Sequence, residues 1–563
     1  MKAGKRLKQH LRRELAASSR ISSLLYQARL WFATRQNRLR IKRLAQQVAS
    51  HAAPSPQQKP VAFFNASSRL FGLSQNAAFS LLTAWSLRLA GTPVAHFVCH
   101  AGMRPCVLGT NRRDYTQAPP CRTCIAQSRR LNREAEVIEF DYQAGAGLNK
   151  ALEDLPLAEL ARFEYALRSP AIKAPAPLGA LALPSLRWAL RRHTLPDDEP
   201  TRYLLRQYIL SAFNVASEFA SFLEKVKPQT AVIFNGIMYP EAIACWVARQ
   251  LGVRTVTHEV GFLPLSAFFT EGEATAYPIH IPDEFELSAA QNARLDAYLE
   301  GRFQGKFSMA GIQFWPEMRD LDEGFLKKAA GFRQVVPIFT NVVYDTSQVH
   351  ANLVFAHMFA WLDQTLPAIR AHLETLFVIR AHPDEMRPGT AKQSQESVRA
   401  WVKERGVDRL DNVIFIDSRE YLSSYALIQR SKFVMVYNSS IGLEATLLGK
   451  PVLCAGKARY TQYPTVFTPA SEAEYRQMVA DFLAAEAPQA PPEFLRHARR
   501  FLYYQLYRAS IPLGEYLQSI PRLGFVSLRR FSWEQLLPEN SSSLRVLGSG
   551  ILHGEPFLLP ETE

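Results

Sequence analysis

A short segment in the second half of the chain has residue types that suit phosphate binding. At residues 436–445, an apolar run is followed by Asn and Ser residues and then by a helical pattern. Such an arrangement gathers free backbone N–H groups, hydroxyls and a helix dipole at one point, which favours an anion. Glu444, one turn inside the helix, is placed to reach a ribose hydroxyl. An ordinary helix cap would show the same residue types. The candidate binding residues are Asn438, Ser439, Ser440, Gly442 and Glu444.

A second polar segment, Arg380–Glu385, directly follows a predicted strand at residues 376–379. In open α/β sheets, ligands bind beyond the carboxyl ends of the strands. Arg380 and His382 share one side if the strand persists, and both can donate to a phosphate. The alternative is a surface turn formed by Pro383 with solvated charges around it. Arg380, His382 and Glu385 are therefore candidates for ligand binding.

Four of the six cysteines are clustered in the first half of the chain, at Cys99, Cys106, Cys121 and Cys124. Two pairs of thiolates, one of them a C-x-x-C pair, are a reasonable four-ligand set for Zn²⁺. An iron–sulfur cluster and metal-free thiols are the alternatives. The set leaves no coordination position open, so we expect a structural role and no catalytic metal. Cys245 and Cys454 stand in apolar segments and are expected to be buried thiols.

These residues require two α/β domains to position them, and 563 residues exceed what one core supports. Apolar runs at 61–64, 94–98, 231–234 and 255–257 predict strands of a first Rossmann-like domain. Runs beginning at 335, 376, 413, 433 and 451 predict a second. The fold class is α/β, with a basic arm at 1–58, a first domain at 59–300 and a second at 330–490. Residues 491–563 are expected to form closing helices and a tail. Residues 99–229 interrupt the first domain and are treated as an insertion.

The net charge of +15 is concentrated in the first 43 residues, which hold thirteen Lys or Arg and a single acid, Glu14. Apolar and aromatic residues lie among these charges: Ile21, Leu24, Leu25, Tyr26, Leu30, Trp31 and Phe32. This mixture favours an amphipathic helix lying on an anionic membrane surface. A solvated tail and an organellar presequence are the alternatives. No apolar run of 18 residues is present, so we expect no transmembrane span.

Together the two polar segments resemble a known family. Arg-x-His-Pro-x-Glu at 380–385, Asn-Ser-Ser-x-Gly-x-Glu-Ala at 438–445 and Leu-Gly-Lys-Pro-Val at 448–452 look like the motifs of bacterial capsule polysaccharide biosynthesis proteins. The segment 339–345, which contains Asn341, resembles the opening of their second domain. Those proteins are glycosyltransferases with two facing Rossmann-like domains, the GT-B architecture. The resemblance covers residues 330–470 well, 230–262 moderately and the first 230 poorly.

The resemblance implies that Arg380 and His382 hold the donor phosphates and that Ser439, Ser440 and Glu444 hold the nucleotide. Its His-Pro element is also similar to that of transferases that use CMP-activated acidic sugars. It also implies a glycan or lipid-linked acceptor. Because no secretory signal or transmembrane span is visible in the sequence, we expect a cytoplasmic enzyme that its basic arm holds at the inner face of the membrane.

Inverting transfer needs a base for the acceptor hydroxyl, and two-domain enzymes usually supply it from the first domain. His258 and Glu259 are the candidates, because they follow a first-domain strand. A structural pair that fixes the loop before Gly261 is the alternative. Asn235 and Gly236 follow the neighbouring strand and are expected to line the same cleft.

Two other functions are compatible with these patterns. A sugar-nucleotide epimerase can use the same double-Rossmann fold, but it would turn over without an acceptor. A nucleic-acid-binding protein would explain a basic chain with a metal module. Nucleic acid is disfavoured as a partner, because the charge lies in one arm and no basic stripe follows it.

Overall fold

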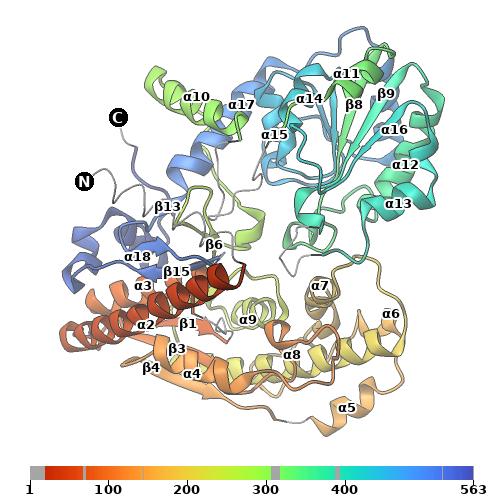
Figure 1. Cartoon of the computed structure of the whole chain (residues 1–563). Coiled ribbons are helices and arrows are strands. Elements are labelled where there is room, and N and C mark those ends of the chain that lie inside the picture. The colour runs from red at the N-terminus through yellow and green to blue at the C-terminus, as the bar shows by residue number, and fades with distance from the viewer. Residues whose placement is uncertain are drawn as a thin grey trace.

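The computed structural model describes residues 19–66, 72–143, 145–305, 318–386, 393–522 and 524–561. Figure 1 shows two lobes, each built around a sheet of mainly parallel strands with helices on both faces. The predicted fold class, two facing Rossmann-like domains, is confirmed. No helix in the described ranges is long and apolar enough to cross a membrane.

The first domain contains a seven-stranded sheet in the order β13-β7-β6-β5-β1-β3-β4. Five strands are parallel, and β7 and β13 run antiparallel at one edge. Their bounds are β1 Val61–Asn65, β3 Val94–Cys99, β4 Glu136–Phe140, β5 Thr230–Phe234, β6 Arg254–Val260, β7 Ser266–Glu271 and β13 Ile511–Pro512.

The central strands β1, β3 and β5 are buried on both faces, which explains why they are nearly continuous apolar runs. In β1, Ala62 and Phe64 join one core cluster, while Val61 and Phe63 join the cluster on the other face. The first face is covered by α7 Leu178–Leu190, α8 Glu199–Val226 and α9 Tyr239–Gln250. The second is covered by α2 Ser19–His51, α3 Gln75–Leu89 and α18 Ser542–His553.

The region 99–229 is not a separate insertion. Its strand β4 pairs with β3 and extends the main sheet, and its helix α8 packs on α9 and β3. Asp198 caps α8, where its side chain accepts a hydrogen bond from the Thr201 amide at 2.9 Å. The remaining helices of the region are α4 Cys121–Leu131, α5 Ala146–Leu152 and α6 Leu157–Leu160.

The predicted arm is in large part a helix of the first domain. Along α2, Ile41, Leu44, Ala45 and Val48 are buried against α3 and β15, at the spacing of one helix face. The Leu528 amide donates to the Asn37 side chain at 2.9 Å and fixes the same face. Residues 1–18 and the side chains of 19–29, including Ile21 to Tyr26, lie outside the described residues.

The second domain contains a five-stranded parallel sheet in the order β10-β9-β8-β11-β12. The strands are β8 Gln334–Phe339, β9 Thr375–Arg380, β10 Val413–Ile416, β11 Val434–Val436 and β12 Val452–Cys454. The helices are α11 Glu323–Ala329, α12 Met358–Ala371, α13 Val398–Glu404, α14 Ser424–Arg430, α15 Ile441–Leu447 and α16 Glu472–Ala484. Each strand starts within two residues of its predicted position.

The chain crosses between the domains twice. Helix α10 Ala289–Phe303 lies in the connection between the domains and packs into the core of the second domain together with α17 Pro492–Tyr503. After a π-helical turn at Tyr504–Arg508, the chain returns to the first domain as β13 and α18. A three-stranded sheet of β14 Leu517–Ser519, β15 Phe525–Leu528 and β2 Leu73–Ser74 completes it. The C-terminal segment is therefore an integral layer of the first domain (Figure 1).

Candidate active site

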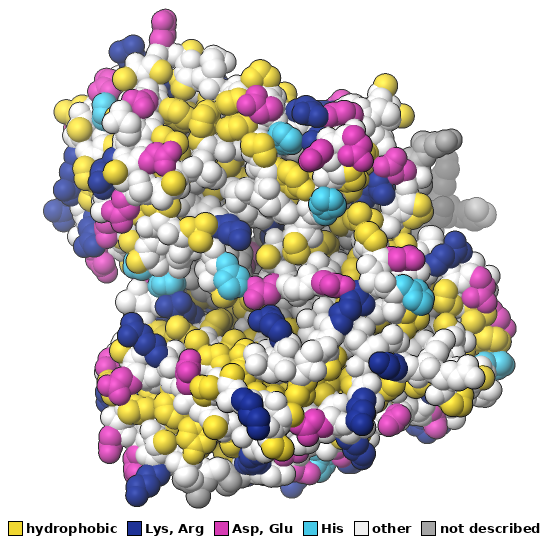
Figure 2. Space-filling model, turned by 180° about the vertical axis from the view of Figure 1, so that it is seen from behind, with side chains coloured by type: hydrophobic (Ala, Val, Ile, Leu, Met, Phe, Trp, Pro, Cys, Tyr) yellow, Lys and Arg dark blue, Asp and Glu magenta, His cyan; other side chains and the backbone are white. Residues whose placement is uncertain are grey.

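A cavity of about 780 Å³ lies between the domains, at the carboxyl ends of the second-domain strands. Figure 2 shows the outside of this junction as an indented seam, with Lys and Arg side chains on both sides of it. We call the cavity between the domains the larger cavity. Seven of the predicted binding residues line it: Asn341, Arg380, His382, Asn438, Ser439, Ser440 and Glu444.

Asn438 organises the polar turn after β11. Its side-chain oxygen accepts hydrogen bonds from Asn341 at 2.5 Å and from Gln348 at 2.9 Å. Its amide group donates to the Ser347 carbonyl at 3.1 Å. The ends of β8 and β11 are thereby held together, which explains why two polar segments about 100 residues apart form one wall.

Glu444 is engaged by protein side chains. Arg302 donates to one carboxylate oxygen at 2.6 Å and Tyr425 donates to the other at 2.5 Å. All three residues are buried, although each also borders the larger cavity. The carboxylate therefore ties α15 to α10 and α14, a structural role in addition to the predicted contact with a ribose.

Arg380 and His382 differ in how they face the larger cavity. The buried Arg380 guanidinium donates to the Asp417 carbonyl at 3.1 Å and to the Leu422 carbonyl at 3.5 Å. Burial lowers its pKa to about 10, which leaves it charged near neutral pH. His382 accepts a hydrogen bond at Nδ1 from the Asp384 amide at 3.1 Å. Its Nε2 therefore carries the proton and is the nitrogen that can donate to a ligand.

Two predicted binding residues lie outside the cavity lining. Glu385 is buried and accepts a hydrogen bond from the Val398 amide at 2.7 Å, at the first turn of α13. Gly442 has a packing role, because a Cβ atom there would lie 2.2 Å from the hydroxyl of Tyr460. That hydroxyl donates to the Ser439 carbonyl at 2.8 Å, so glycine lets Tyr460 hold the turn.

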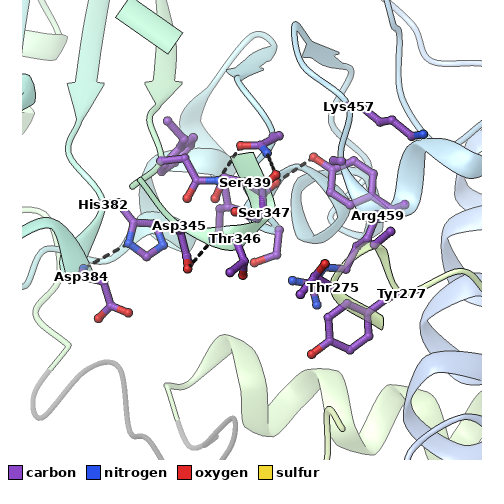
Figure 3. Close-up of a pocket in the computed structure, with 18 of the residues that line it drawn as sticks. Thr275, Tyr277, Asp345, Thr346, Ser347, His382, Asp384, Ser439, Lys457 and Arg459 are labelled. Carbon is purple, nitrogen blue, oxygen red and sulfur yellow. Dashed lines mark hydrogen bonds between the residues drawn. The ribbon is translucent and has the colours of Figure 1, made fainter. Parts of the chain in front are cut away.

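Two cationic residues of the larger cavity were missed from the sequence, Lys457 and Arg459. Both follow β12, a predicted strand, so the rule that ligands bind beyond strand ends could have identified them. In Figure 3, Arg459 reaches toward Thr275 and Tyr277, on the side of the pocket away from His382. Its guanidinium stacks on Tyr277 at 4.4 Å and on Phe262 at 4.8 Å, both in the first domain.

A smaller cavity of about 340 Å³ lies in the first domain, at the carboxyl ends of β1, β3, β5 and β6. Its lining mixes polar side chains such as Asn65 and Asn132 with apolar ones such as Trp188. Glu259, Asp345 and Thr346 line both this smaller cavity and the larger one. The two cavities therefore meet at two carboxylates, Glu259 from the first domain and Asp345 from the second.

The two candidate bases lie in different environments. His258 is buried between the rings of Phe234 and Phe269, and burial lowers its pKa to about 3. It is neutral near pH 7 and a weak proton acceptor. Glu259 is half-buried and held by the side chains of Asn76 at 3.1 Å and Asn235 at 2.8 Å. Of the two, the geometry favours Glu259 as the base.

Asn235 and Gly236 make the turn that brings an amide to Glu259. Both have positive φ angles, 64° and 84°, a conformation that Asn and Gly tolerate better than other residues. Asn235 lines the smaller cavity as predicted, whereas Gly236 packs beneath it against Thr257.

The four clustered cysteines line a third, small cavity in the first domain. None of the chain's six cysteines, all within the described residues, forms a disulfide. Among the described side chains, no three potential ligands are already grouped closely enough to hold a metal ion. Cys245 and Cys454 are buried thiols, as predicted.

The buried Glu385 generates a prediction about stability and pH. Burial raises its pKa to about 8, well above that of an unfolded chain, so folding favours the protonated acid. Its contribution to stability is complete below about pH 4.5 and is lost as the pH rises through about 8, at no more than ~1.4 kcal/mol per pH unit. We expect Glu385→Gln, which stays neutral, to gain in melting temperature relative to the wild type across this window.

Melting curves at half-unit pH steps will measure the difference. Glu404→Gln, an exposed position on the neighbouring α13, is the matched control and should follow the wild type. Parallel curves for Glu385→Gln and the wild type would show that Glu385 is not a buried acid.

The second domain matches the sequence model of a known protein family. Residues 317–464 match the family model "Capsule polysaccharide biosynthesis protein". The comparison with curated proteins gave no match. Solved structures that the comparison matched include Thermosulfurimonas dismutans KpsC, beta Kdo 2,4 transferase, at 12% identity and TM-score 0.33, over 55% of this chain and 87% of that one.

Another is UDP-GlcNAc 2-epimerase from Neisseria meningitidis, at 13% identity and TM-score 0.27, over 79% of this chain and 98% of that one. Likenesses this distant say nothing about activity. The family match covers the stretch that holds Asn341, the segment 380–385 and the segment 438–445. This chain therefore carries, in its second domain, a region of the capsule polysaccharide biosynthesis family.

Proposed function

We propose that the chain is a glycosyltransferase that moves a sugar from a nucleotide-activated donor to a glycan or lipid-linked acceptor in capsule or other surface polysaccharide biosynthesis. The observation that carries the proposal is the meeting of two cavities at Glu259 and Asp345. A transferase needs separate places for donor and acceptor and one point where their reacting atoms meet. The family match of the second domain supports the same reaction class.

The larger cavity is the proposed donor site. Its volume lies in the range of small-molecule sites, and it has hydrogen-bond donors on opposite sides, at His382 and Arg459. Both can donate to phosphate oxygens and stabilise the charge that develops on the leaving nucleotide. Because these donors can stabilise that charge, we propose that transfer does not need a catalytic metal. A CMP-activated acidic sugar is the proposed donor, on the resemblance of the His-Pro element.

The smaller cavity is the proposed acceptor site, with Glu259 as the general base. A base must come within hydrogen-bond reach of the acceptor hydroxyl, and Glu259 lies where the two cavities join. The hydrogen bonds from Asn76 and Asn235 hold its carboxylate at that junction.

An epimerase is the second candidate, and the smaller cavity argues against it. An epimerase acts on one nucleotide sugar and needs no site for an acceptor. The distinguishing assay follows release of free nucleotide from a panel of CMP-, UDP- and GDP-sugars, with and without glycolipid acceptors. Release that depends on the acceptor, with or without added Mg²⁺, supports the transferase. Isomerisation of a nucleotide sugar without acceptor would overturn it.

Arg459 generates the prediction for nucleotide binding. Replacing it with Gln removes a charge-assisted hydrogen bond to phosphate, worth roughly 1.5–3 kcal/mol, so affinity should fall tenfold or more. Thermal shifts with CMP, UDP, GDP and CDP will first identify the nucleotide, because a ligand of the folded state raises its stability. Titration of the variant then measures the loss. Arg430→Gln, an exposed arginine on α14, is the matched control, and equal affinities in both variants would remove Arg459 from the site.

Glu259 generates the prediction for catalysis. Glu259→Gln keeps the size of the side chain but removes the base, so kcat should fall by about 10²–10⁴ while nucleotide affinity is unchanged. Glu271→Gln is the control, because Glu271 also lines the larger cavity but pairs with Arg254. A Glu259→Gln enzyme that keeps the wild-type kcat would exclude this residue as the base.

We also propose that the outer face of α2 docks on an anionic membrane. Trp31 and Phe32 are 55% and 57% exposed, and the Arg35 guanidinium lies 5.3 Å from the Trp31 ring centre. Arg35, Leu39 and Lys42 continue this face at helical spacing, opposite the face that packs on the domain. Aromatic rings beside basic groups on a fixed helix suit a lipid interface. Docking would bring the enzyme to the membrane that holds a lipid-linked acceptor.

The membrane proposal predicts the behaviour of one double variant. Removing two exposed aromatic rings with Trp31→Ala and Phe32→Ala should weaken binding to anionic vesicles about tenfold or more. Co-sedimentation with vesicles at low and high salt will measure it, and the remaining binding should fall as salt screens the basic groups. Leu373→Ala, which changes an exposed apolar side chain of the second domain, is the control. Equal sedimentation of all three proteins would show that α2 is not the anchor.

A further inference from the structure

Four cysteines from three separate places in the first domain converge on one small cavity, which we call the cysteine cavity. Cys99 ends β3, Cys106 caps the short helical turn Val107–Gly109, and Cys121 and Cys124 occupy the first turn of α4. All four line a cavity of about 30 Å³. They span 26 residues of the chain, so their convergence is a property of the fold and not of local spacing alone.

Two of the sulfurs already accept backbone hydrogen bonds. The Gly102 amide donates to Cys99 Sγ and the Gly109 amide donates to Cys106 Sγ, each at 3.2 Å. Each cysteine is followed three residues later by its glycine, so the chain turns twice in the same way. Amide donors of this kind stabilise negative charge on sulfur, as a bound metal's thiolates require.

The glycines are required by packing. A Cβ atom on Gly102 would lie 2.3 Å from the Phe140 ring, and one on Gly109 would lie 2.7 Å from Pro119. The two turns are therefore fixed against β4 and against the segment that leads into α4. This packing holds the backbone of Cys99 and Cys106 beside the cysteine cavity before any ligand is present.

We propose that Cys99, Cys106, Cys121 and Cys124 bind one Zn²⁺ ion that braces the wall of the smaller cavity. Four sulfur ligands are a common structural zinc set. The cysteine cavity has about 30 Å³ of space, which is enough for a single ion. Side-chain rotation must draw the sulfurs inward for all four to bond the ion.

The position of the cysteine cavity gives the ion a role beyond local stability. Cys106 and Leu108 line both the cysteine cavity and the smaller cavity. One side of the loop at 106–109 would thus be held by the metal, while the other side faces the proposed acceptor. This part of the inference depends on the proposed function, whereas metal binding itself does not.

The first experiment measures metal content by elemental analysis of the full chain, purified without chelators after growth with both zinc and iron. We expect about one zinc per chain in the wild type, and less than a tenth of that in Cys121→Ser. Cys245→Ala is the matched control, because it removes a buried thiol elsewhere in the same domain and should keep the full zinc content. Metal-free wild-type protein, iron in place of zinc, or equal loss in both variants would overturn the proposal.

A second experiment works even if Cys121→Ser folds poorly. Wild-type protein is stripped of metal and refilled with Co²⁺, whose visible spectrum reports tetrahedral thiolate ligation. Strong thiolate-to-cobalt absorption that added zinc abolishes is the expected result, and a spectrum of cobalt bound by oxygen ligands would contradict the site. In the stripped protein, the thermal shift caused by nucleotide should be unchanged, since the larger cavity lies elsewhere. The stripped protein should also lose acceptor-dependent rate. If it does so while the thermal shift caused by nucleotide is unchanged, the loss is due to the missing metal and not to a failure of the proposed donor site.

Discussion

The buried ion pair between Arg302 and Glu444 is the interaction on which the larger cavity depends. Arg302 comes from α10, in the connection between the domains, and Glu444 comes from α15 in the second domain. Burial of both groups makes their 2.6 Å contact costly to break, because either partner alone would be an uncompensated charge. The turn that carries Ser439 and Ser440 directly precedes α15, so the same pair that fixes this helix also fixes the wall of the cavity.

The two domains are held close on both sides of the cavity. On one side, the Glu396 carboxylate accepts hydrogen bonds from the backbone amides of His193 and Thr194 at 2.8 and 3.0 Å. On the other, the Ile279 amide donates to the side chain of Gln462 at 2.9 Å. At the rim, His350 lies 2.6 Å from Glu273. The structure therefore shows the domains in a conformation in which Glu259 and Asp345 border a common space.

The sequence predicted the parts of this site that depend on strand ends. The strands of the second domain are apolar runs followed by polar residues, so 380–382 and 438–440 could be placed at one sheet edge. Glu385 and Gly442 belong to the same motifs but serve α13 and Tyr460, contacts that no local pattern reveals. Lys457 and Arg459 also follow a strand, and they were missed because their segment resembles no motif.

Two parts of the fold were not predicted. In the arm, the many basic residues drew attention away from the apolar spacing of residues 41, 44, 45 and 48, which pack α2 on the first domain. The return of the C-terminal segment to the first domain was unpredictable, because β13 is two residues long and its pairing partner lies about 240 residues away.

That return has a consequence for how the protein is made. One face of the first sheet packs against Leu544, Leu547, Ile551 and Phe557, which are among the last core residues to be synthesised. While the ribosome is still translating the second domain, Phe63, Val232 and Val256 of the first have no such cover. The domain that begins first is thus completed last, after the other has emerged. Until then, its uncovered apolar face is a surface for chaperones to shield, and a truncated message would yield a chain prone to aggregation.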